Sequence, residues 1–347
     1  MNSVFGIKLK YKLRKINKYD LEKMITYANS NANQAMKIIY IGTRNHPILE
    51  ALIHSSHEIK GIAESTLNKK ASVLKSLLFN AYDLLQSIKG KSVLQLSSQA
   101  KKQKVPYLVF SEEQKTLANW VSSLKPDIIV VHSMYQLLKK DVFSIPKYGA
   151  INYHPSLLPN YPGSSPDFWV YYNMDLNPGG TVHLINDGED TGEIIYAQSF
   201  PLELGTSYNE YKAQYCELGA ELVLKALKDI ETDSMQLKKQ IETSEITRAR
   251  RIKKEEHQSF IDWQTWSTER VFHFLRGTLT YVKSVPLPKN AGSGSYWKVV
   301  SFIKELSQNK PGTIKNNGKQ YLLYCKDGAI IMELKKSFSL VIKSLFL

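Results

Sequence analysis

The segment KIIYIGT, at residues 37–43, is a short apolar run that ends in glycine, and it predicts a strand buried on both faces of a sheet. Helical and strand patterns alternate after it. We expect helices at residues 47–55, 112–124 and 208–230, and strands at residues 57–63, 107–110, 127–131, 149–153 and 181–185. This alternation predicts an α/β fold with a doubly wound, mostly parallel sheet, whose ligands bind beyond the carboxyl ends of the strands.

The composition is typical of a globular chain with more than one domain. The 347 residues are 43% hydrophobic, and no apolar run reaches the roughly 18 residues that span a bilayer. The first residues lack the apolar stretch and cleavage site of a signal peptide, so we expect a cytoplasmic protein. Cys216 and Cys325 stand alone in the sequence, which favours free thiols and no metal site. The net charge of +14 suits an acidic partner such as a nucleic acid, a nucleotide, an anionic cofactor or a membrane surface.

Changes in composition divide the chain into four parts. Residues 1–35 form a basic N-terminal extension, and residues 36–230 hold the alternating elements. Polar residues dominate residues 231–251, which we interpret as a linker. In residues 252–347, a short helix at residues 267–275 precedes strand-like pieces that are separated by Asn-Gly and Asp-Gly, which are hairpin signals. We therefore predict a smaller, barrel-like β domain at the C-terminus.

The most informative polar residues lie at the end of the strand expected at residues 149–153. Asn152 and His154 are two positions apart, so both side chains leave the same face of an extended strand. Pro155 favours ending the strand at this point. A later acidic loop carries Asp190. An amide, an imidazole and a carboxylate could serve a hydrolytic site, a metal site or an acyl-transfer site.

Two of these alternatives fit the residues poorly. A carboxamide is a poor zinc ligand, only one imidazole is near in sequence, and the Gly-x-Ser-x-Gly motif of serine hydrolases is absent. Transfer of an acyl group from a carrier to an external nucleophile fits better. Asn152 can donate to an oxyanion, His154 can donate when it is protonated, and Asp190 can hold the imidazole and help to take a proton.

The motif NYHPSLLP at residues 152–159, followed by GEDTG at residues 188–192, resembles the signature of the formyltransferases that use 10-formyltetrahydrofolate. In that signature an Asp follows the Asn by about 38 positions, and here 190 minus 152 is 38. The resemblance covers residues 36–230. It implies a catalytic trio of Asn152, His154 and Asp190, with 10-formyltetrahydrofolate as the formyl donor.

The same resemblance implies which residues bind the donor, and the residues in and beyond the Leu-Leu-Pro turn offer candidate contacts to the acceptor. Backbone groups of two loops would hold the pteridine ring of the donor, and these loops contain Tyr135, Gln136, Leu137, Leu138, Asn186, Asp187, Gly188, Glu189 and Asp190. The candidate acceptor contacts are Ser156, Tyr161, Phe168, Trp169 and Tyr172. The serine could instead only support the turn, and the aromatic side chains could instead belong to the core.

The C-terminal part resembles the barrel of methionyl-tRNA formyltransferases and of a sugar-modifying formyltransferase. The residues that carry this resemblance are FIDW at 260–263, Arg276, PGTI at 311–314 and DGA at 327–329. Two departures from the family concern the acceptor. Tyr-Pro-Gly at residues 161–163 replaces the usual aromatic-Arg-Gly, and residues 65–104 contain no Arg, where the transfer-RNA enzymes carry an Arg-rich loop.

Three functions remain open at this stage. The acceptor could be an amino sugar on a nucleotide carrier, as in relatives that serve O-antigen and other cell-surface glycan biosynthesis. It could be initiator methionyl-tRNA, which the net charge and the barrel favour and the two departures oppose. The protein could also be a non-catalytic binding protein that keeps the fold. We favour the amino sugar, with a siderophore or amino-acid amine as a smaller alternative, and a homodimer as the assembly to consider.

Overall fold

The computed structural model describes residues 35–67, 95–241, 246–305, 307–318 and 320–337. The predicted basic extension, except for Ala35, lies outside the described residues, as does most of the Arg-free segment that follows the second strand. Within the described residues no helix is both long and apolar enough to cross a membrane.

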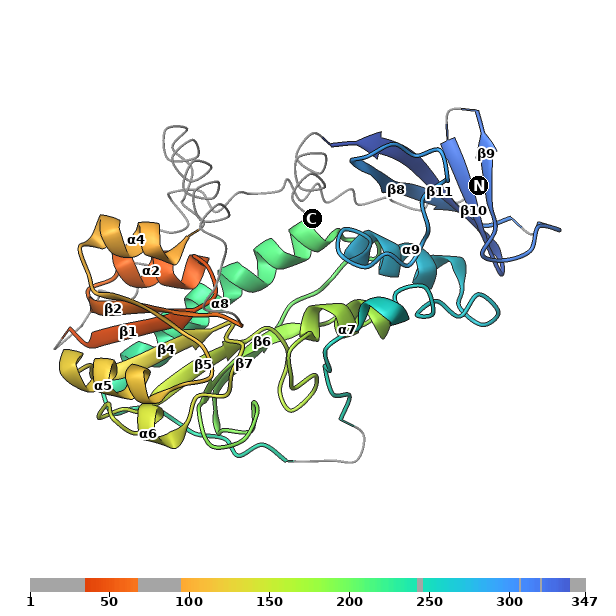
Figure 1. The fold of residues 1–347 in the computed structure, drawn as a ribbon. Coiled ribbons are helices and arrows are strands. Elements are labelled where there is room, and N and C mark those ends of the chain that lie inside the picture. The colour runs from red at the N-terminus through yellow and green to blue at the C-terminus, as the bar shows by residue number, and fades with distance from the viewer. Residues whose placement is uncertain (1–34, 68–94, 242–245, 306, 319, 338–347) are drawn as a thin grey trace.

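The described residues form two sheets, each with its own helices (Figure 1). The strands of the larger sheet are β1 (Lys37–Gly42), β2 (Glu58–Ser65), β3 (Tyr107–Phe110), β4 (Ile128–His132), β5 (Ala150–His154), β6 (Gly179–Leu184) and β7 (Ile194–Ser199). The helices around it are α2 (Pro47–His54), α4 (Leu96–Gln103), α5 (Lys115–Leu124), α6 (Lys140–Phe143), α7 (Pro166–Tyr172) and α8 (Tyr208–Glu231). The remaining elements are η1 (Lys254–Glu256), α9 (Thr268–Thr278), β8 (Ser295–Ile303), β9 (Ile314–Asn317), β10 (Gln320–Cys325) and β11 (Gly328–Lys336).

The larger sheet confirms the predicted doubly wound α/β fold. Its strand order is β3-β2-β1-β4-β5-β6-β7, so strands are added to one side of β1 up to β3 and to the other side from β4 onward. The first five strands in this order pair in parallel, whereas β6 and β7 are antiparallel additions at one edge. Ligand sites of such sheets lie beyond the carboxyl ends of the strands near a reversal of this kind.

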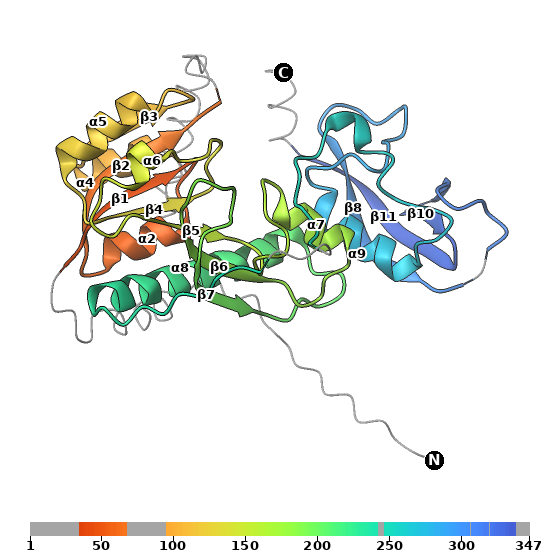
Figure 2. The same ribbon diagram turned by 90° about the horizontal axis from the view of Figure 1, so that it is seen from below.

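Helices cover both faces of the larger sheet, as the two views show (Figures 1 and 2). Alternate residues of β1 belong to different clusters, with Ile38 in the cluster that α2, α4 and α8 complete and Ile39 in the cluster that α5 and α6 complete. Both residues are fully buried. The apolar run at residues 37–43 is therefore explained by burial on two faces.

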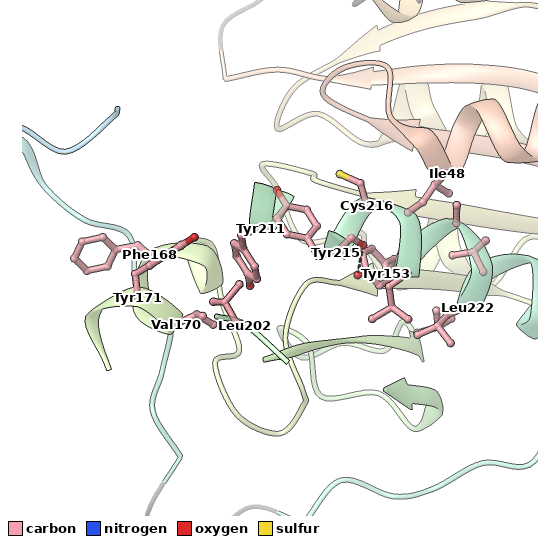
Figure 3. Close-up of a cluster of buried hydrophobic side chains, with 14 of the residues drawn as sticks. Ile48, Tyr153, Phe168, Val170, Tyr171, Leu202, Tyr211, Tyr215, Cys216 and Leu222 are labelled. Atoms are coloured by element: carbon pink, nitrogen blue, oxygen red, sulfur yellow. Dashed lines mark hydrogen bonds between the residues drawn. The ribbon is translucent and has the colours of Figure 1, made fainter. Parts of the chain in front are cut away.

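Tyr153 anchors β5 to the helix behind it. Because it lies between Asn152 and His154 in an extended strand, its side chain leaves the opposite face of the sheet. Its hydroxyl donates to the carbonyl of Tyr215 at 2.6 Å (Figure 3). A Cβ at Gly180 or Gly219 would lie within 2.5 Å of this side chain, so both glycines are needed for the close approach. The strand that carries the polar pair is thus held rigidly from its buried face.

The helix α8 begins with a complete capping box. The hydroxyl of Ser207 accepts from the N–H of Glu210, and the Glu210 carboxylate accepts from the N–H of Ser207. Its buried residues run from Tyr211 to Ile230 and form one continuous cluster with residues of α2 and α7 (Figure 3). The prediction of a long helix packed on the sheet is confirmed.

The smaller sheet contains four antiparallel strands in the order β8-β11-β10-β9. The turn between β10 and β11 falls at Lys326-Asp327, one residue before the predicted Asp-Gly pair, and β9 ends at Asn317, within the predicted Asn-Gly pair. The predicted smaller C-terminal β domain is confirmed, and within the described residues it is an open antiparallel sheet with β8 and β9 as its edges. The helix α9 is three residues longer at its C-terminal end than the sequence indicated.

The helices α7 and α9 lie between the two sheets in both views (Figures 1 and 2). Phe168 of α7 contacts Phe260 and Phe274, with ring centroids 4.6 and 5.8 Å apart. Arg276 of α9 donates to the carbonyls of Gly205 and Val299, so it links the segment before α8 to β8. Aromatic packing and this arginine join the two halves of the protein.

Candidate active site

The predicted polar pair lies at the carboxyl end of β5, next to the point where the strand order reverses. Val131 of β4 is opposite Asn152, and Asn152 is in turn opposite His183 of β6. The strand ends at His154, immediately before Pro155, as predicted. Asn152 and His154 both contact the carboxylate of Asp190, so they do share one face of the strand.

Asp190 is delivered to this face by a tightly constrained turn. Its φ is +57°, a left-handed conformation that is uncommon for a residue with a side chain. The Asn186 side-chain oxygen accepts from Gly188 N–H and from the Thr191 hydroxyl, which closes the turn internally. A turn of this conformation is maintained only when its surroundings stabilise it, and such backbone strain is common at functional sites.

The Asp190 carboxylate is the centre of the cluster. Its Oδ2 accepts from the N–H of Gly163 at 2.8 Å and lies 3.5 Å from His154 Nδ1. Its Oδ1 lies 3.4 Å from the amide nitrogen of Asn152 and 3.6 Å from His183 Nε2. The structure therefore brings together the three residues that the sequence singled out.

Burial acts to raise the pKa of the Asp190 carboxyl group. The neighbouring His154 and His183 rings and the Gly163 N–H act against it and together lower this pKa to about 2. Burial also lowers the pKa of His154, while Asp190 and the Tyr161 carbonyl raise it in part. At neutral pH the pair therefore consists of a carboxylate and a neutral imidazole.

The position of the proton on His154 follows from its partners. His154 Nε2 lies 2.8 Å from the carbonyl oxygen of Tyr161, which can only accept, so Nε2 carries the hydrogen. In the neutral ring Nδ1 is then a lone pair that faces Asp190 Oδ2. A proton that enters between these two atoms is shared by a carboxylate and an imidazole, which makes the pair a proton acceptor.

His183 is a site residue that the sequence reasoning missed. Its Nδ1 donates to the carbonyl of Leu184 at 2.8 Å, so in the neutral ring Nε2 accepts from the amide of Asn152 at 3.1 Å. The ring thus fixes which way the Asn152 amide is turned. The only signal in the sequence was its place on the next strand, and the antiparallel register with β5 was needed to identify its partner.

The first predicted donor-binding loop, residues 133–138, follows β4 directly. Gln136 holds it, because its side-chain oxygen accepts from Ser65 Oγ and its amide donates to the Thr66 carbonyl. Tyr135 and Leu137 are half exposed, at 50% and 55%, whereas Leu138 is buried in the core. The loop therefore presents apolar surface at the same edge of the sheet as the Asp190 cluster. The second predicted loop, which runs from Asn186 to Asp190, is the turn described above.

The candidate acceptor contacts have different surroundings. Ser156 is buried, and its hydroxyl donates to the Asn160 carbonyl, so it supports the turn. Tyr161 reaches the cluster through its carbonyl oxygen, which accepts from His154. Trp169 donates to the Arg250 carbonyl and packs beside the Arg250 side chain. These contacts account for the serine and the tryptophan without an acceptor.

Phe168 and Tyr172 lie in the aromatic cluster between the two sheets. Phe168 is fully buried, and Tyr172 packs against Trp266 with ring centroids 5.3 Å apart. We therefore leave Phe168 out of the proposed acceptor contacts, because its side chain is not accessible. Within the described residues no group of three His, Cys, Asp or Glu side chains has the arrangement of a metal site, and Cys216 and Cys325 are free and buried.

A family model described as formyl transferase matches residues 36–227, which is more than half of the chain. The methionyl-tRNA formyltransferase of Alkaliphilus oremlandii is 30% identical over 295 residues, which cover 83% of this chain and 87% of that protein. The methionyl-tRNA formyltransferase of Clostridium beijerinckii is 30% identical over 223 residues, or 64% of this chain and 70% of that protein.

Two solved structures share the fold over most of the chain. One is the sugar 3N-formyl transferase WlaRD in the presence of dTDP and 5-N-formyl-THF, with a TM-score of 0.58, 16% identity, and coverage of 88% of this chain and 100% of that one. The other is an N-formyltransferase from Helicobacter canadensis in complex with folinic acid and dTDP-3-aminofucose, with a TM-score of 0.59, 16% identity, and coverage of 87% and 100%. At this identity the likeness concerns the fold alone.

Proposed function

The chain belongs to the formyl transferase family, and on that premise we propose that it transfers a formyl group from 10-formyltetrahydrofolate to a primary amine. The observation that carries the proposal is the convergence of Asn152, His154 and Asp190 on one point at the carboxyl edge of the larger sheet. The donor would supply an activated formyl group. The protein would supply the charge stabilisation and the proton acceptor.

The donor fits the surface beside the trio. The half-exposed side chains of Tyr135 and Leu137 offer apolar area to a flat ring, and Gln136 keeps the loop in place through Ser65 and Thr66. The turn from Asn186 to Asp190 lies at the same edge and offers backbone groups for a polar ring edge. Cofactor sites commonly combine apolar walls with a few fixed polar groups.

Asn152 would meet the negative charge that develops on the formyl oxygen. One amide hydrogen is directed to His183 and the other to Asp190 Oδ1, and the longer bond to Asp190, at 3.4 Å, is the one that Asn152 would exchange for the formyl oxygen. Donors placed in advance cost no reorganisation when the charge appears, and each is worth about 3 to 4 kcal/mol where it has been measured.

His154 and Asp190 would take the proton that the amine loses on attack. The gap between His154 Nδ1 and Asp190 Oδ2 is the place for that proton, and the resulting imidazolium would place a positive charge beside the developing oxyanion. The same proton can then leave with the departing nitrogen of the donor. This cycle returns the pair to a carboxylate and a neutral ring.

For the acceptor we favour an amino sugar linked to a nucleotide. Two sequence departures support this choice: Tyr-Pro-Gly at residues 161–163 and the absence of Arg from residues 65–104. Exposed basic side chains are available to a diphosphate, including Arg251 and Lys253 in the segment beside the 161–165 loop. The glycan product of such an enzyme would place it in O-antigen or related biosynthesis in the cytoplasm.

The second candidate acceptor is initiator methionyl-tRNA. The relatives that share about 30% identity over most of the chain are named for it, and the net charge of +14 suits a polyanion. A transfer-RNA acceptor would give turnover that falls steeply with salt, because binding releases counterions from the phosphates. A small sugar nucleotide would show a much weaker dependence.

A panel of acceptors tests both the choice of acceptor and the catalytic role of Asn152. The purified protein is mixed with 10-formyltetrahydrofolate and either nucleotide-linked amino sugars or charged initiator tRNA, and release of tetrahydrofolate is followed. We expect transfer to a sugar, and at least about a hundredfold slower turnover in Asn152→Ala than in the exposed control Asn177→Ala. Preference for the RNA would overturn the choice of acceptor. Equal rates in the two variants would overturn the role of Asn152.

A further inference from the structure

The segment that joins the two sheets does more than connect them. Lys238 pairs with Ile194 at the start of β7 through two backbone hydrogen bonds of 2.8 and 2.9 Å. Farther along, the carbonyl of Thr247 accepts from Tyr161 N–H, and Ala249 exchanges two backbone hydrogen bonds with Pro162 and Ser165. The joining segment therefore runs beside both loops that supply partners to the catalytic cluster.

The contacts of residues 247–249 fix the position of the loop from Tyr161 to Gly163, which holds Asp190 and His154. The loop from Tyr161 to Gly163 provides the carbonyl that accepts from His154 and the N–H that donates to Asp190. A Cβ at Gly163 would lie 2.9 Å from the Ala249 carbonyl oxygen, so the two backbones are packed with no room for a side chain. The position of the Gly163 N–H thus depends on residues 247–249.

Gln240 holds the backbone of the turn that carries Asp190. Its Nε2 donates to the carbonyl of Asp190 at 2.8 Å and to the carbonyl of Gly192 at 2.7 Å. The two hydrogens of one amide therefore clamp the turn that keeps Asp190 in its left-handed conformation. On the same loop, Arg248 forms an ion pair with Glu189, the residue just before Asp190.

We propose that Gln240, in the segment that joins the two sheets, is a positioning residue that fixes Asp190 against His154. The inference rests on the proposed function, because it takes Asp190 to be the carboxylate of the catalytic trio. Both donors of the Gln240 amide are directed to backbone carbonyls of the turn, so the role assigned to it is positioning. It acts by holding the backbone of the turn, and displacement of a catalytic group by about 1 Å can cost about a hundredfold in rate.

The first test is the substitution Gln240→Met, which keeps the length of the side chain and removes both donors. With the acceptor that reacts fastest in the panel, we expect kcat to fall by about tenfold to a hundredfold while KM for donor and acceptor changes little. Lys239→Met, at the exposed neighbouring position, is the matched control and should leave both parameters unchanged. A kcat within about twofold of wild type in Gln240→Met would overturn the proposal.

A double-mutant cycle tests whether Gln240 works through Asp190. In the background Asp190→Asn, the further change Gln240→Met should have almost no effect on kcat, because the group it positions is already disabled. If the two effects multiply instead, Gln240 acts by another route and the proposal is wrong.

Hydrogen exchange provides a test that needs no ligand. The Gly163 amide, which donates to the Asp190 carboxylate, should exchange faster in Gln240→Met than in wild type, while amides within α8 should not change. Unchanged exchange at Gly163 would overturn the proposal. If Gly163 exchanges faster in Gln240→Met but no acceptor is formylated, the proposed function fails and the positioning of Asp190 by Gln240 stands.

Discussion

Residues 150–163 and the helix α7, which begins only three residues later, differ sharply in how they are stabilised. The first stretch places Asn152, His154 and the Gly163 N–H around one buried carboxylate through hydrogen bonds. The second buries Phe168, Val170 and Tyr171 in apolar contacts, with no charge pair among them.

The difference shows that residues 150–163 position polar groups for catalysis, whereas the adjacent helix α7 stabilises the fold by apolar packing. A buried polar group must have partners, so the first stretch is constrained by direction and distance. A buried aromatic ring needs only complementary volume, so the second tolerates change in direction but not in size. A Cβ at Gly277 of α9 would lie 2.1 Å from the Tyr171 ring, which illustrates how closely the second contact is packed.

The largest expected effect is on stability, from Phe168→Ala. Removing a fully buried ring that contacts Phe260 and Phe274 should lower the free energy of unfolding by about 3 to 5 kcal/mol. Because the ring is not part of the cluster at Asp190, the folded fraction should keep most of its kcat. Urea unfolding and activity at low temperature measure the two quantities. A near-native stability with lost activity would mean that Phe168 belongs to the site after all.

A second effect concerns pH and the first stretch, because Nδ1 of the buried His132 lies 3.0 Å from the Tyr153 carbonyl oxygen. Burial lowers the pKa of His132 to about 4, well below the usual 6.5, and burial also lowers the pKa of His46 and of His154. The unfolded chain therefore binds more protons than the folded one between pH 6.5 and 4, and stability falls as the pH falls through this window. His132 alone should contribute on the order of 3 kcal/mol.

The check on this prediction is the pH dependence of unfolding in urea for wild type and for His132→Gln. The variant should show a flatter slope between pH 6.5 and 4, because its side chain does not titrate. The Asp190 carboxyl, whose pKa is lowered to about 2, should add a further loss only below about pH 3.8. An equal slope in both proteins would show that His132 is not buried neutral in solution.

The smallest effect tests how the polar stretch is oriented. His183→Leu removes the ring that accepts from the Asn152 amide, so the amide is free to turn, and we expect kcat to fall by about tenfold. His54→Leu, at an exposed position on α2, is the matched control. If His183→Leu lowers stability strongly but leaves kcat unchanged, His183 stabilises the fold and does not orient Asn152 for catalysis.

The sequence predicted much of the first stretch and little of the second. Asn152, His154 and Asp190 were identified because a strand has a fixed period of two and because their spacing matches a family signature. The end of the strand before Pro155 was predicted for a local steric reason. Phe168 was ambiguous, since an aromatic residue after a turn has the same local pattern whether it meets a ligand or another helix.

The sequence by itself determined the alternating elements, the long helix α8 and the hairpins of the small sheet, because each depends on neighbours a few positions away. It also identified the polar trio, because the spacing of 38 positions matches a family signature. Only the tertiary structure decided that His183 orients Asn152, that Gln240 holds the Asp190 turn and that α7 packs on α9. These contacts join residues 31, 50 and more than 100 positions apart. No local propensity encodes such pairings, because they arise from the register of antiparallel strands and the path of a segment between two sheets.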